Sequence, residues 1–418
     1  MALEHIPATD PAVSRALADE LESQRSRLML VASGNHLSPA VLEAQGTVVA
    51  NERAEGYPGA RYFAGLDHVD EIETYAIERA TELFGAEHVN VQPHSGTQSN
   101  MGVYVAMLDP GDTILSLELS HGGHLSHGHS VNFAGQYYDI VHYHLDLETG
   151  RIDYDELESK AGEHDPDVIV SGFSAYPRRI EWERIQSVAD AVGAYHMADI
   201  AHITGLVAAG EHPSPVGIAD FVTGSTHKSL RAGRGGFIMC DDEDADAIDA
   251  GVFPGSQGDP LMHNVTGKAV GFKEALTPEF ESYAAQIVTN AEVLAESLME
   301  HGLDLVSDGT DTHLMLVDLR DSHPDVTGKQ AESLLEDVGI ILNANPVPGD
   351  PRPPKVTSGI RIGTPAVTTR GLDESDMERL GGLIARTLDD PADERVTADI
   401  QDEVSELCTA NPLYEDYE

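Results

Sequence analysis

Two side chains near the middle of the chain have the types and the spacing to do chemistry together. Asp199 ends an apolar run, AYHMAD, and Lys228 follows a second apolar run, DFVTGS, 29 residues later. That separation fits one strand–crossover–strand unit, which would bring both side chains to the same end of neighbouring strands. A lysine amine can form a Schiff base with an aldehyde, and a carboxylate can hold the nitrogen of a pyridine ring. The pair therefore predicts a site for a cofactor that carries both groups.

The alternative for Lys228 is an ordinary surface lysine. Lysine is scarce in this chain, however: only six of its 25 basic residues are lysines, and the others are arginines. Lys228 also stands between an apolar run and the glycine-rich segment RAGRGG. Loss of water beside other cations would make such an amine more nucleophilic. We therefore favour the Schiff-base interpretation.

A second candidate lies in QPHSGTQ, where a predicted strand passes into a predicted helix at Ser95, Gly96 and Thr97. Backbone N–H groups at a helix start, together with hydroxyl groups and a glycine that permits close approach, form a site for a phosphate. The same residues would also serve as an ordinary helix N-cap. The segment alone does not separate these two interpretations.

The segment HGGHLSHGH carries four histidines, at positions 121, 124, 127 and 129. Such a cluster is one way to hold a metal ion. No cysteine or carboxylate accompanies it, and glycines interleave, so we predict no metal here. Stacking of one imidazole on an aromatic cofactor and a simple polar turn are the other two interpretations.

Two further charged residues stand in unusual surroundings. Arg361 lies in an apolar, strand-like segment, GIRIGTP, where an arginine is costly unless it meets an anion. It could clamp a substrate carboxylate or form an internal ion pair. Glu55 stands among glycines and aromatics in AEGYPGARYF, where it could exchange protons with a substrate or merely cap the chain.

Short β-rich runs alternate with helical spacing from about residue 88 onward, which predicts an α/β domain with a mainly parallel sheet. We divide the chain into an N-terminal helical arm (1–27), a large domain (28–279), and a smaller α+β C-terminal domain with an acidic tail (280–418). Residues 264–301 read as helical throughout. The seven predicted strands of the large domain are HVNVQPH, TILSLEL, YDIVHYHL, DVIVSGFSAY, AYHMADIAH, DFVTGS and GFIMCD.

The composition restricts the class of protein. The 72 acidic and 25 basic residues give a formal net charge of −47, spread along the whole chain. Salt would screen the resulting self-repulsion, so the charge favours a protein adapted to high salt and disfavours nucleic-acid binding. The two cysteines support neither a disulfide framework nor a cysteine metal site. No signal-like or membrane-spanning run is present, and we expect a soluble, cytoplasmic protein.

Together these segments resemble the serine hydroxymethyltransferase family, in a form typical of haloarchaea. The resemblance extends from about residue 28 to 390 and rests on ordered segments that include AEGYPG, NVQPHSGTQ, HGGHLSHG, DIAHITGLVAAG, STHK, RGG and SGIRIGTPA. It implies a fold-type-I, aspartate-aminotransferase-like enzyme that uses pyridoxal phosphate (PLP) and takes tetrahydrofolate as co-substrate. The implied reaction moves a one-carbon unit reversibly between serine and tetrahydrofolate, giving glycine and methylene-tetrahydrofolate.

The resemblance also implies roles for individual residues. Lys228 is implied as the Schiff-base lysine, Asp199 as the partner of the pyridine nitrogen, His124 as the stacking histidine, and Glu55 as the proton-exchanging carboxylate. Arg361 would hold the substrate carboxylate, with Ser33 and Phe63 nearby, and Leu125 and Asn345 would contact the folate. The site is implied to be shared across a homodimer, alone or within a tetramer, with the 53–63 loop supplied by the neighbouring subunit. The remaining implied cofactor contacts are Ser95, Gly96, Thr97, Ser174, His202, His227 and Arg234.

Four departures from the family pattern keep other functions open. Gly34 replaces a glutamate, Phe63 and Arg53 each replace a tyrosine, and Asp259 replaces a glycine. Arg53 and Asp259 stand where the family approaches the cofactor phosphate across the interface, and we hypothesise that the two changes compensate. The alternatives are a folate-independent aldolase for threonine or other β-hydroxy amino acids, and a catalytically weak PLP-binding homologue.

Overall fold

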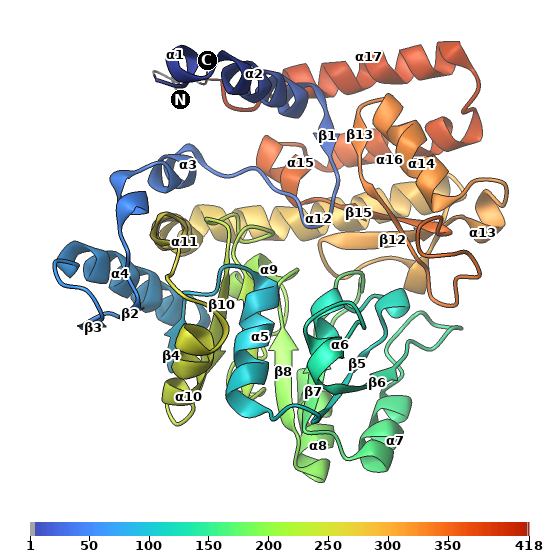
Figure 1. Cartoon of the computed structure of the whole chain (residues 1–418). Helices are drawn as coiled ribbons and strands as arrows, with labels where there is room; N and C mark the ends of the chain where they lie inside the picture. Colours follow the sequence, from blue (N-terminus) through green and yellow to red (C-terminus); the bar gives the residue numbers. More distant parts are fainter. Residues whose placement is uncertain (1–4, 416, 418) are drawn as a thin grey trace. The chain divides into compact units, whose positions relative to one another are not determined.

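The computed structural model describes residues 5–415 and residue 417 (Figure 1). The chain forms two compact units: residues 40–285 make one, and residues 1–39 together with 286–418 make the other. The N-terminal segment thus belongs to the same unit as the C-terminal part. The domain boundaries expected at residues 28 and 280 remain predictions.

The unit of residues 40–285 is built on a seven-stranded sheet in the order β4-β10-β9-β8-β7-β5-β6. The strands from β9 to β6 pair in parallel, and β10 is antiparallel to both of its neighbours. All seven predicted strands are present, and the mainly parallel sheet is confirmed. Their bounds are β4 His88–Asn90, β5 Thr113–Leu117, β6 Asp139–Tyr143, β7 Val168–Ser171, β8 Tyr195–Asp199, β9 Phe221–Ser225 and β10 Gly236–Cys240.

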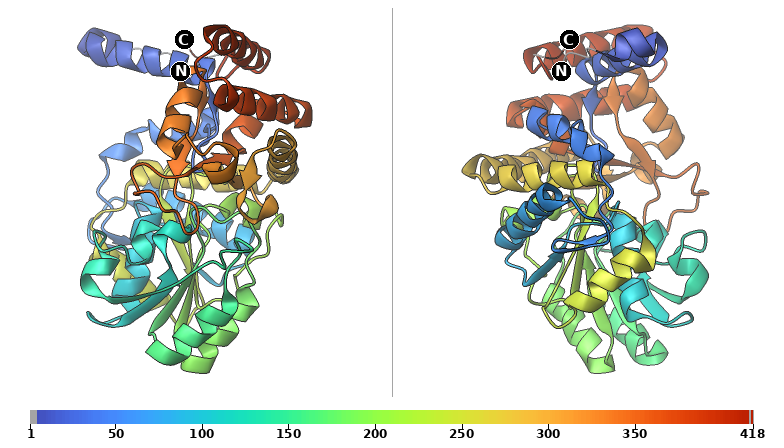
Figure 2. Two further views of the ribbon diagram at one scale, coloured as in Figure 1. Left: turned by 90° about the vertical axis from the view of Figure 1, so that its right-hand side faces the viewer. Right: turned by 60° about the vertical axis from the view of Figure 1, so that its left-hand side comes forward.

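Helices pack against this sheet, as Figures 1 and 2 show. Short 3-10 turns and a small hairpin, β2 Gly56–Tyr57 with β3 Ala60–Arg61, fill the connections. The helices of the unit are α3 Pro39–Gln45, α4 Asp67–Phe84, α5 Gly96–Met107, α6 Ala134–Tyr137, α7 Tyr154–His164, α8 Trp182–Val192, α9 Thr204–Ala208, α10 Ala245–Ala250 and α11 Met262–Ala275.

Burial explains why the strands read as near-continuous apolar runs. Every residue of β7, β9 and β10 is buried, as expected for strands covered on both faces. Val170, Met197 and Ile238 from three of the strands share one core with Val103 of α5. A rigid sheet therefore supports the loops that leave its strand ends.

The other unit contains a four-stranded antiparallel sheet in the order β11-β12-β15-β14. Its core combines these strands with Leu28 and Leu30 of the N-terminal segment and with helices of the C-terminal part of the chain. The strands are β11 Asp304–Leu305, β12 Leu314–Asp318, β14 Asn343–Asn345 and β15 Gly359–Gly363, and a separate pair joins β1 Leu28–Met29 to β13 Ile340–Ile341. The helices are α1 Ile6–Thr9, α2 Pro11–Ser26, α13 Leu319–Ser322, α14 Gly328–Asp337, α15 Pro365–Arg370, α16 Glu374–Asp389 and α17 Glu394–Ala410.

One expectation about helices is corrected, and one helix was not predicted. The run 264–301 is not one helix: α11 ends at Ala275 and α12 runs over Pro278–Glu300, because Pro278 disfavours helical geometry at the residue before it. The acidic segment after residue 390 forms α17, where Ile400, Val404 and Leu407 make an apolar stripe at helical spacing. Among the helices of the described residues, none has the length and apolar character needed to span a bilayer.

Candidate active site

The strand ends of the sheet of residues 40–285 surround a cavity of about 160 Å³. Asp199 ends β8, Lys228 follows β9 by three residues, and these two strands are parallel neighbours. Their side chains therefore reach one cavity, as their spacing predicts. The cavity is lined by Ser95, Gly96, Thr97, His124, His127, Phe173, Ser174, Asp199, Ala201, His202, Ser225, His227 and Lys228.

Asp199 is a buried carboxylate surrounded by hydrogen-bond donors. Its Oδ1 accepts a hydrogen bond from the backbone N–H of Ala201 at 2.9 Å. Its Oδ2 accepts from Asn100 Nδ2 at 2.8 Å and from His127 Nε2 at 2.9 Å. Burial by itself would raise the pKa of Asp199. The hydrogen bonds from His127 and Asn100 and the charges of His127 and His124 outweigh burial and hold the pKa well below its usual range. Asp199 is thus a fixed negative charge at neutral pH.

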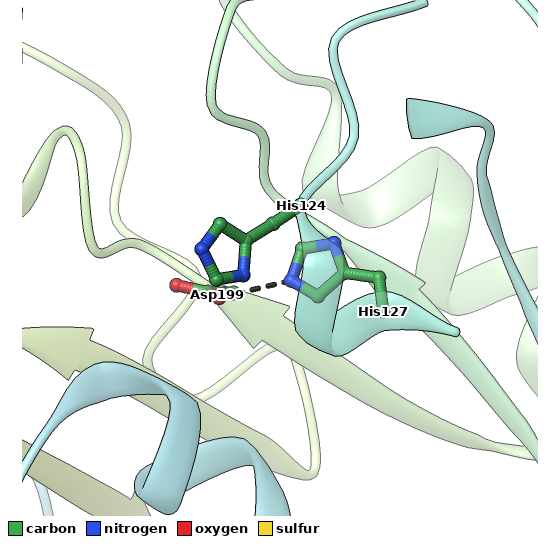
Figure 3. A group of neighbouring side chains, drawn as sticks. All are labelled: His124, His127 and Asp199. Carbon is green, nitrogen blue, oxygen red and sulfur yellow. Dashed lines mark hydrogen bonds and ion pairs between the residues drawn. The ribbon is translucent and has the colours of Figure 1, made fainter. Parts of the chain in front are cut away.

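His127 and Asn100 were not among the predicted site residues, yet both contact Asp199 directly. Thr223 orients the amide of Asn100 by donating to its Oδ1 at 2.6 Å. His124 and His127 stand at either end of one 3-10 turn, Leu125–His127, and Figure 3 shows both rings beside the carboxylate. Residues three apart on such a turn lie on the same side. The spacing of His124 and His127 in HLSH was therefore the signal that could have identified His127.

Ligand atoms of His124, His127 and Asp199 lie within 4.8 Å of one another, so this trio has the composition of a possible metal site. Both oxygens of Asp199 already accept hydrogen bonds from protein donors, however. This arrangement orients one carboxylate towards the cavity and suits a protonated ring nitrogen better than an ion. We therefore retain the prediction that no metal is held here.

The start of α5 forms one wall of the cavity. Ser95 is the N-cap, its hydroxyl accepts from Gln98 N at 3.3 Å, and the first backbone N–H groups of the helix follow it. A side chain at position 96 would not fit, because a Cβ there would lie 2.6 Å from Ser225 Oγ. The positive end of the helix dipole and these donors suit an anionic phosphate. The donor set and the space left by Gly96 therefore fit the phosphate of PLP.

His227 and Arg234 lie beside the lysine. Arg234 Nη1 donates to His227 Nε2 at 3.2 Å. Burial, together with the charges of Arg234 and Lys228, lowers the pKa of His227 to about 3, so this ring is neutral at neutral pH. We call residues 95–97 the phosphate wall. Because the His227 ring is neutral, the positive charge near this wall comes from Arg234 and Lys228.

The loop around Glu55 does not line this cavity in the single chain. Arg53 Nη2 donates to Glu55 Oε1 at 2.7 Å, and Arg53 Nε donates to Asp259 Oδ2 at 3.0 Å. The guanidinium also lies 5.5 Å from the centre of the Phe63 ring. Arg53 thus joins Glu55 to two of the residues at which the sequence departs from the family pattern.

The remaining predicted residues divide between the two units. Leu125 belongs to the same unit as Lys228 and is exposed. Ser33, Asn345 and Arg361 belong to the other unit. There, Arg361 Nε and Nη2 donate to Asn343 Oδ1 at 3.1 and 3.0 Å, and burial lowers the pKa of Arg361 to about 10. This half-buried guanidinium therefore remains charged at neutral pH.

Comparisons with known proteins extend over almost the entire chain. A sequence model described as "Serine hydroxymethyltransferase" matches residues 6–384. A curated protein named serine hydroxymethyltransferase from Halobacterium salinarum is 62% identical over 415 residues, covering 99% of this chain and 100% of that relative. The chain belongs to the serine hydroxymethyltransferase family.

Other relatives of the same name agree. The serine hydroxymethyltransferase of Natronomonas pharaonis is 63% identical, covering 99% of this chain and 98% of its own, and that of Haloarcula marismortui is 61% identical, covering 99% and 100%. Serine hydroxymethyltransferases are fold-type-I PLP enzymes, which agrees with the α/β architecture and the mainly parallel sheet. The adaptation to high salt predicted from the net charge of −47 fits these haloarchaeal relatives.

The contact between Arg53 and Asp259 allows the compensation hypothesis to be tested as a double-mutant cycle. We expect Asp259→Gly to change PLP affinity by about 3- to 10-fold when Arg53 is present, because the arginine then loses one of its two carboxylate partners. In the Arg53→Tyr background, the same change should have a different effect. PLP affinity is measured by titration of the apoenzyme in molar salt. Equal effects of Asp259→Gly in both backgrounds would show that the two positions act independently.

Proposed function

We propose that this chain catalyses the reversible transfer of a one-carbon unit between serine and tetrahydrofolate, with Lys228 and Asp199 at the centre of its active site. The observation that carries the assignment of residues is that both side chains face one cavity whose wall begins with Ser95 and Gly96. Membership of the serine hydroxymethyltransferase family supports the reaction. It does not favour the aldolase or the catalytically weak homologue.

The residues that would hold the cofactor have separable tasks. PLP, when bound, supplies an aldehyde for covalent attachment and a ring that withdraws electrons from the bond to be broken. Lys228 would provide the amine that attaches it. Asp199 would hold a proton at the ring nitrogen, because a fixed negative charge favours the protonated form.

The other cavity residues position the group held by Lys228. Ser95, Gly96 and Thr97 would bind the phosphate through the start of α5, with His227 and Arg234 beside them. His124 would pack against the ring, and Ser174 and His202, which line the same cavity, would also lie near it.

Substrate binding and proton transfer are assigned to residues outside that cavity. Arg361 holds the carboxylate of serine, with Ser33 and Phe63 nearby, and Glu55 exchanges a proton with the serine hydroxyl. Leu125 and Asn345 contact the folate. We also propose a homodimer or tetramer in which the 53–63 loop serves the neighbouring subunit, and a cytoplasmic location.

An assay in molar salt tests the proposal. The protein is purified with PLP, the visible absorbance of the bound cofactor is recorded, and serine cleavage is measured with and without tetrahydrofolate. We expect glycine formation that depends on tetrahydrofolate. Threonine cleavage with no response to folate would favour the aldolase, and a bound cofactor without turnover of any amino acid would favour the weak homologue.

A further inference from the structure

A buried network of charged and amide side chains lies directly behind the loop that carries Glu55. The side chains of Arg61 and Glu73 are 3% and 1% exposed, and Arg61 Nη2 donates to Glu73 Oε2 at 2.6 Å. Arg61 Nε donates to Asp70 Oδ1 at 2.8 Å. None of these side chains lines the cavity described above.

This network holds the backbone on both sides of Glu55. Arg61 Nη1 donates to the carbonyl oxygens of Ala54 and Gly56, each at 2.8 Å. Gln92 Nε2 donates to the same Gly56 oxygen at 2.9 Å and to Glu73 Oε1 at 2.7 Å. Gly56 has a φ of +96°, and a Cβ there would lie 2.4 Å from the backbone oxygen of Ala60, so the turn admits only glycine. The peptide groups flanking Glu55 are therefore fixed from behind.

Gln92 also belongs to the segment that leads into the phosphate wall. Lys268, which is 1% exposed, donates through Nζ to the carbonyl oxygens of Val91 at 2.6 Å and Pro93 at 3.0 Å. Those two residues flank Gln92, and Ser95 follows three positions later. Buried basic side chains thus donate to the carbonyl groups of the residues on both sides of Glu55 and on both sides of Gln92. The Gln92 side chain connects the two segments directly, through its hydrogen bond to the Gly56 carbonyl oxygen.

Such a network is a costly way to stabilise a fold. Removing Arg61 and Glu73 from water carries a desolvation penalty that the ion pair only offsets when its geometry is good, and apolar residues often serve stability equally well. In addition, Gln92 Oε1 is buried and finds no partner among the described residues. The amide group of Gln92 is thus oriented so that its nitrogen donates two hydrogen bonds, while its oxygen accepts none from the described residues.

We propose that Glu73 and Gln92 are positioning residues for Glu55, joining its loop to the strand end that carries the phosphate wall. The inference rests on the role of Glu55 in the proposed function. The backbone of this loop sets the position of the Glu55 side chain. Small shifts of Ala54 or Gly56 therefore displace its carboxylate. A displacement of about 1 Å can reduce turnover about 100-fold without loss of binding.

The test replaces Gln92 by methionine, which has a similar size and no hydrogen-bonding amide. We expect Gln92→Met to lower kcat for folate-dependent serine cleavage by about 10- to 100-fold. Because Lys228, Asp199 and Ser95 keep their contacts, PLP affinity and the KM for serine should change by less than about 3-fold. Gln186→Met is the matched control: Gln186 of α8 also uses its amide in two side-chain hydrogen bonds, to Asp190 and His196.

A second comparison separates positioning from a general loss of structure. In a Glu55→Gln background, measured with enzyme in excess over substrate, Gln92→Met should cause no further loss of kcat if it acts through Glu55. Glu73→Gln, which preserves the volume of the side chain, should lower kcat in the same direction and remains available if Gln92→Met fails to fold.

The outcomes are distinguishable from one another. Equal kcat in Gln92→Met, Gln186→Met and the unsubstituted protein would overturn the inference, as would an undiminished loss in the Glu55→Gln background. A fall in kcat that parallels a fall in PLP affinity or thermal midpoint would also overturn it. Absence of folate-dependent turnover in the unsubstituted protein would instead count against the proposed function itself.

Discussion

Lys228→Ala is expected to abolish covalent attachment of PLP and to lower kcat for serine cleavage by about 10³-fold or more. The reason is that Lys228 lines the cavity at the strand ends, and the other residues of that cavity wall offer no primary amine. Borohydride reduction followed by peptide mass spectrometry measures the attachment. Visible absorbance measures any cofactor that remains bound without the covalent link.

The matched control is Lys273→Ala. Lys273 is an exposed lysine of α11, in the same unit of the chain. It should retain both the covalent cofactor and the turnover of the unsubstituted protein. Normal turnover by Lys228→Ala, or cofactor attached to another lysine after reduction, would show that the centre of the site has been assigned wrongly.

Asp199→Asn is expected to have the second-largest effect, a loss of about 10²- to 10⁴-fold in kcat. The substitution preserves shape but removes the negative charge that keeps the ring nitrogen protonated. It also turns an N–H₂ group towards donors, because Ala201 N, Asn100 Nδ2 and His127 Nε2 all point at the carboxylate. Turnover and the absorbance of the bound cofactor are measured together, since attachment through Lys228 should survive.

Asp220→Asn controls for loss of a carboxylate from the same sheet. Asp220 precedes β9 and accepts a hydrogen bond from the backbone N–H of His196 at 2.7 Å, at the strand end away from the cavity. Its substitution is expected to affect stability more than kcat. If Asp199→Asn and Asp220→Asn reduced turnover equally, Asp199 would have no special relation to the cofactor.

Much of the framework around Lys228 was predictable because the strands of a sheet covered on both faces must be apolar over their whole length. The runs AYHMAD and DFVTGS therefore identified β8 and β9, and the distance between them identified a single crossover. α17 was missed because the acidic residues between Ile400, Val404 and Leu407 obscured an apolar stripe that only becomes clear at helical spacing.

The contacts that orient the site were not predictable in the same way. His127 and Asn100 meet Asp199 across 72 and 99 positions of the chain, and hydrogen bonds of this kind leave no periodic pattern in the sequence. The same holds for Arg53 with Asp259, which were paired by hypothesis because both stand where the family approaches the cofactor phosphate. Their 3.0 Å contact depends on how two distant loops fold.

The sequence by itself therefore determined the sheet, the identity of the lysine and carboxylate at its strand ends, and the family to which they point. Local residue types decide these features, since apolar periodicity and helix-start residues act over a few positions. Only the tertiary structure decided which donors hold Asp199 and which buried side chains stand behind Glu55. Those contacts depend on three-dimensional packing. Arg61, Glu73 and Gln92 meet because α4, the β2–β3 hairpin and the end of β4 pack together.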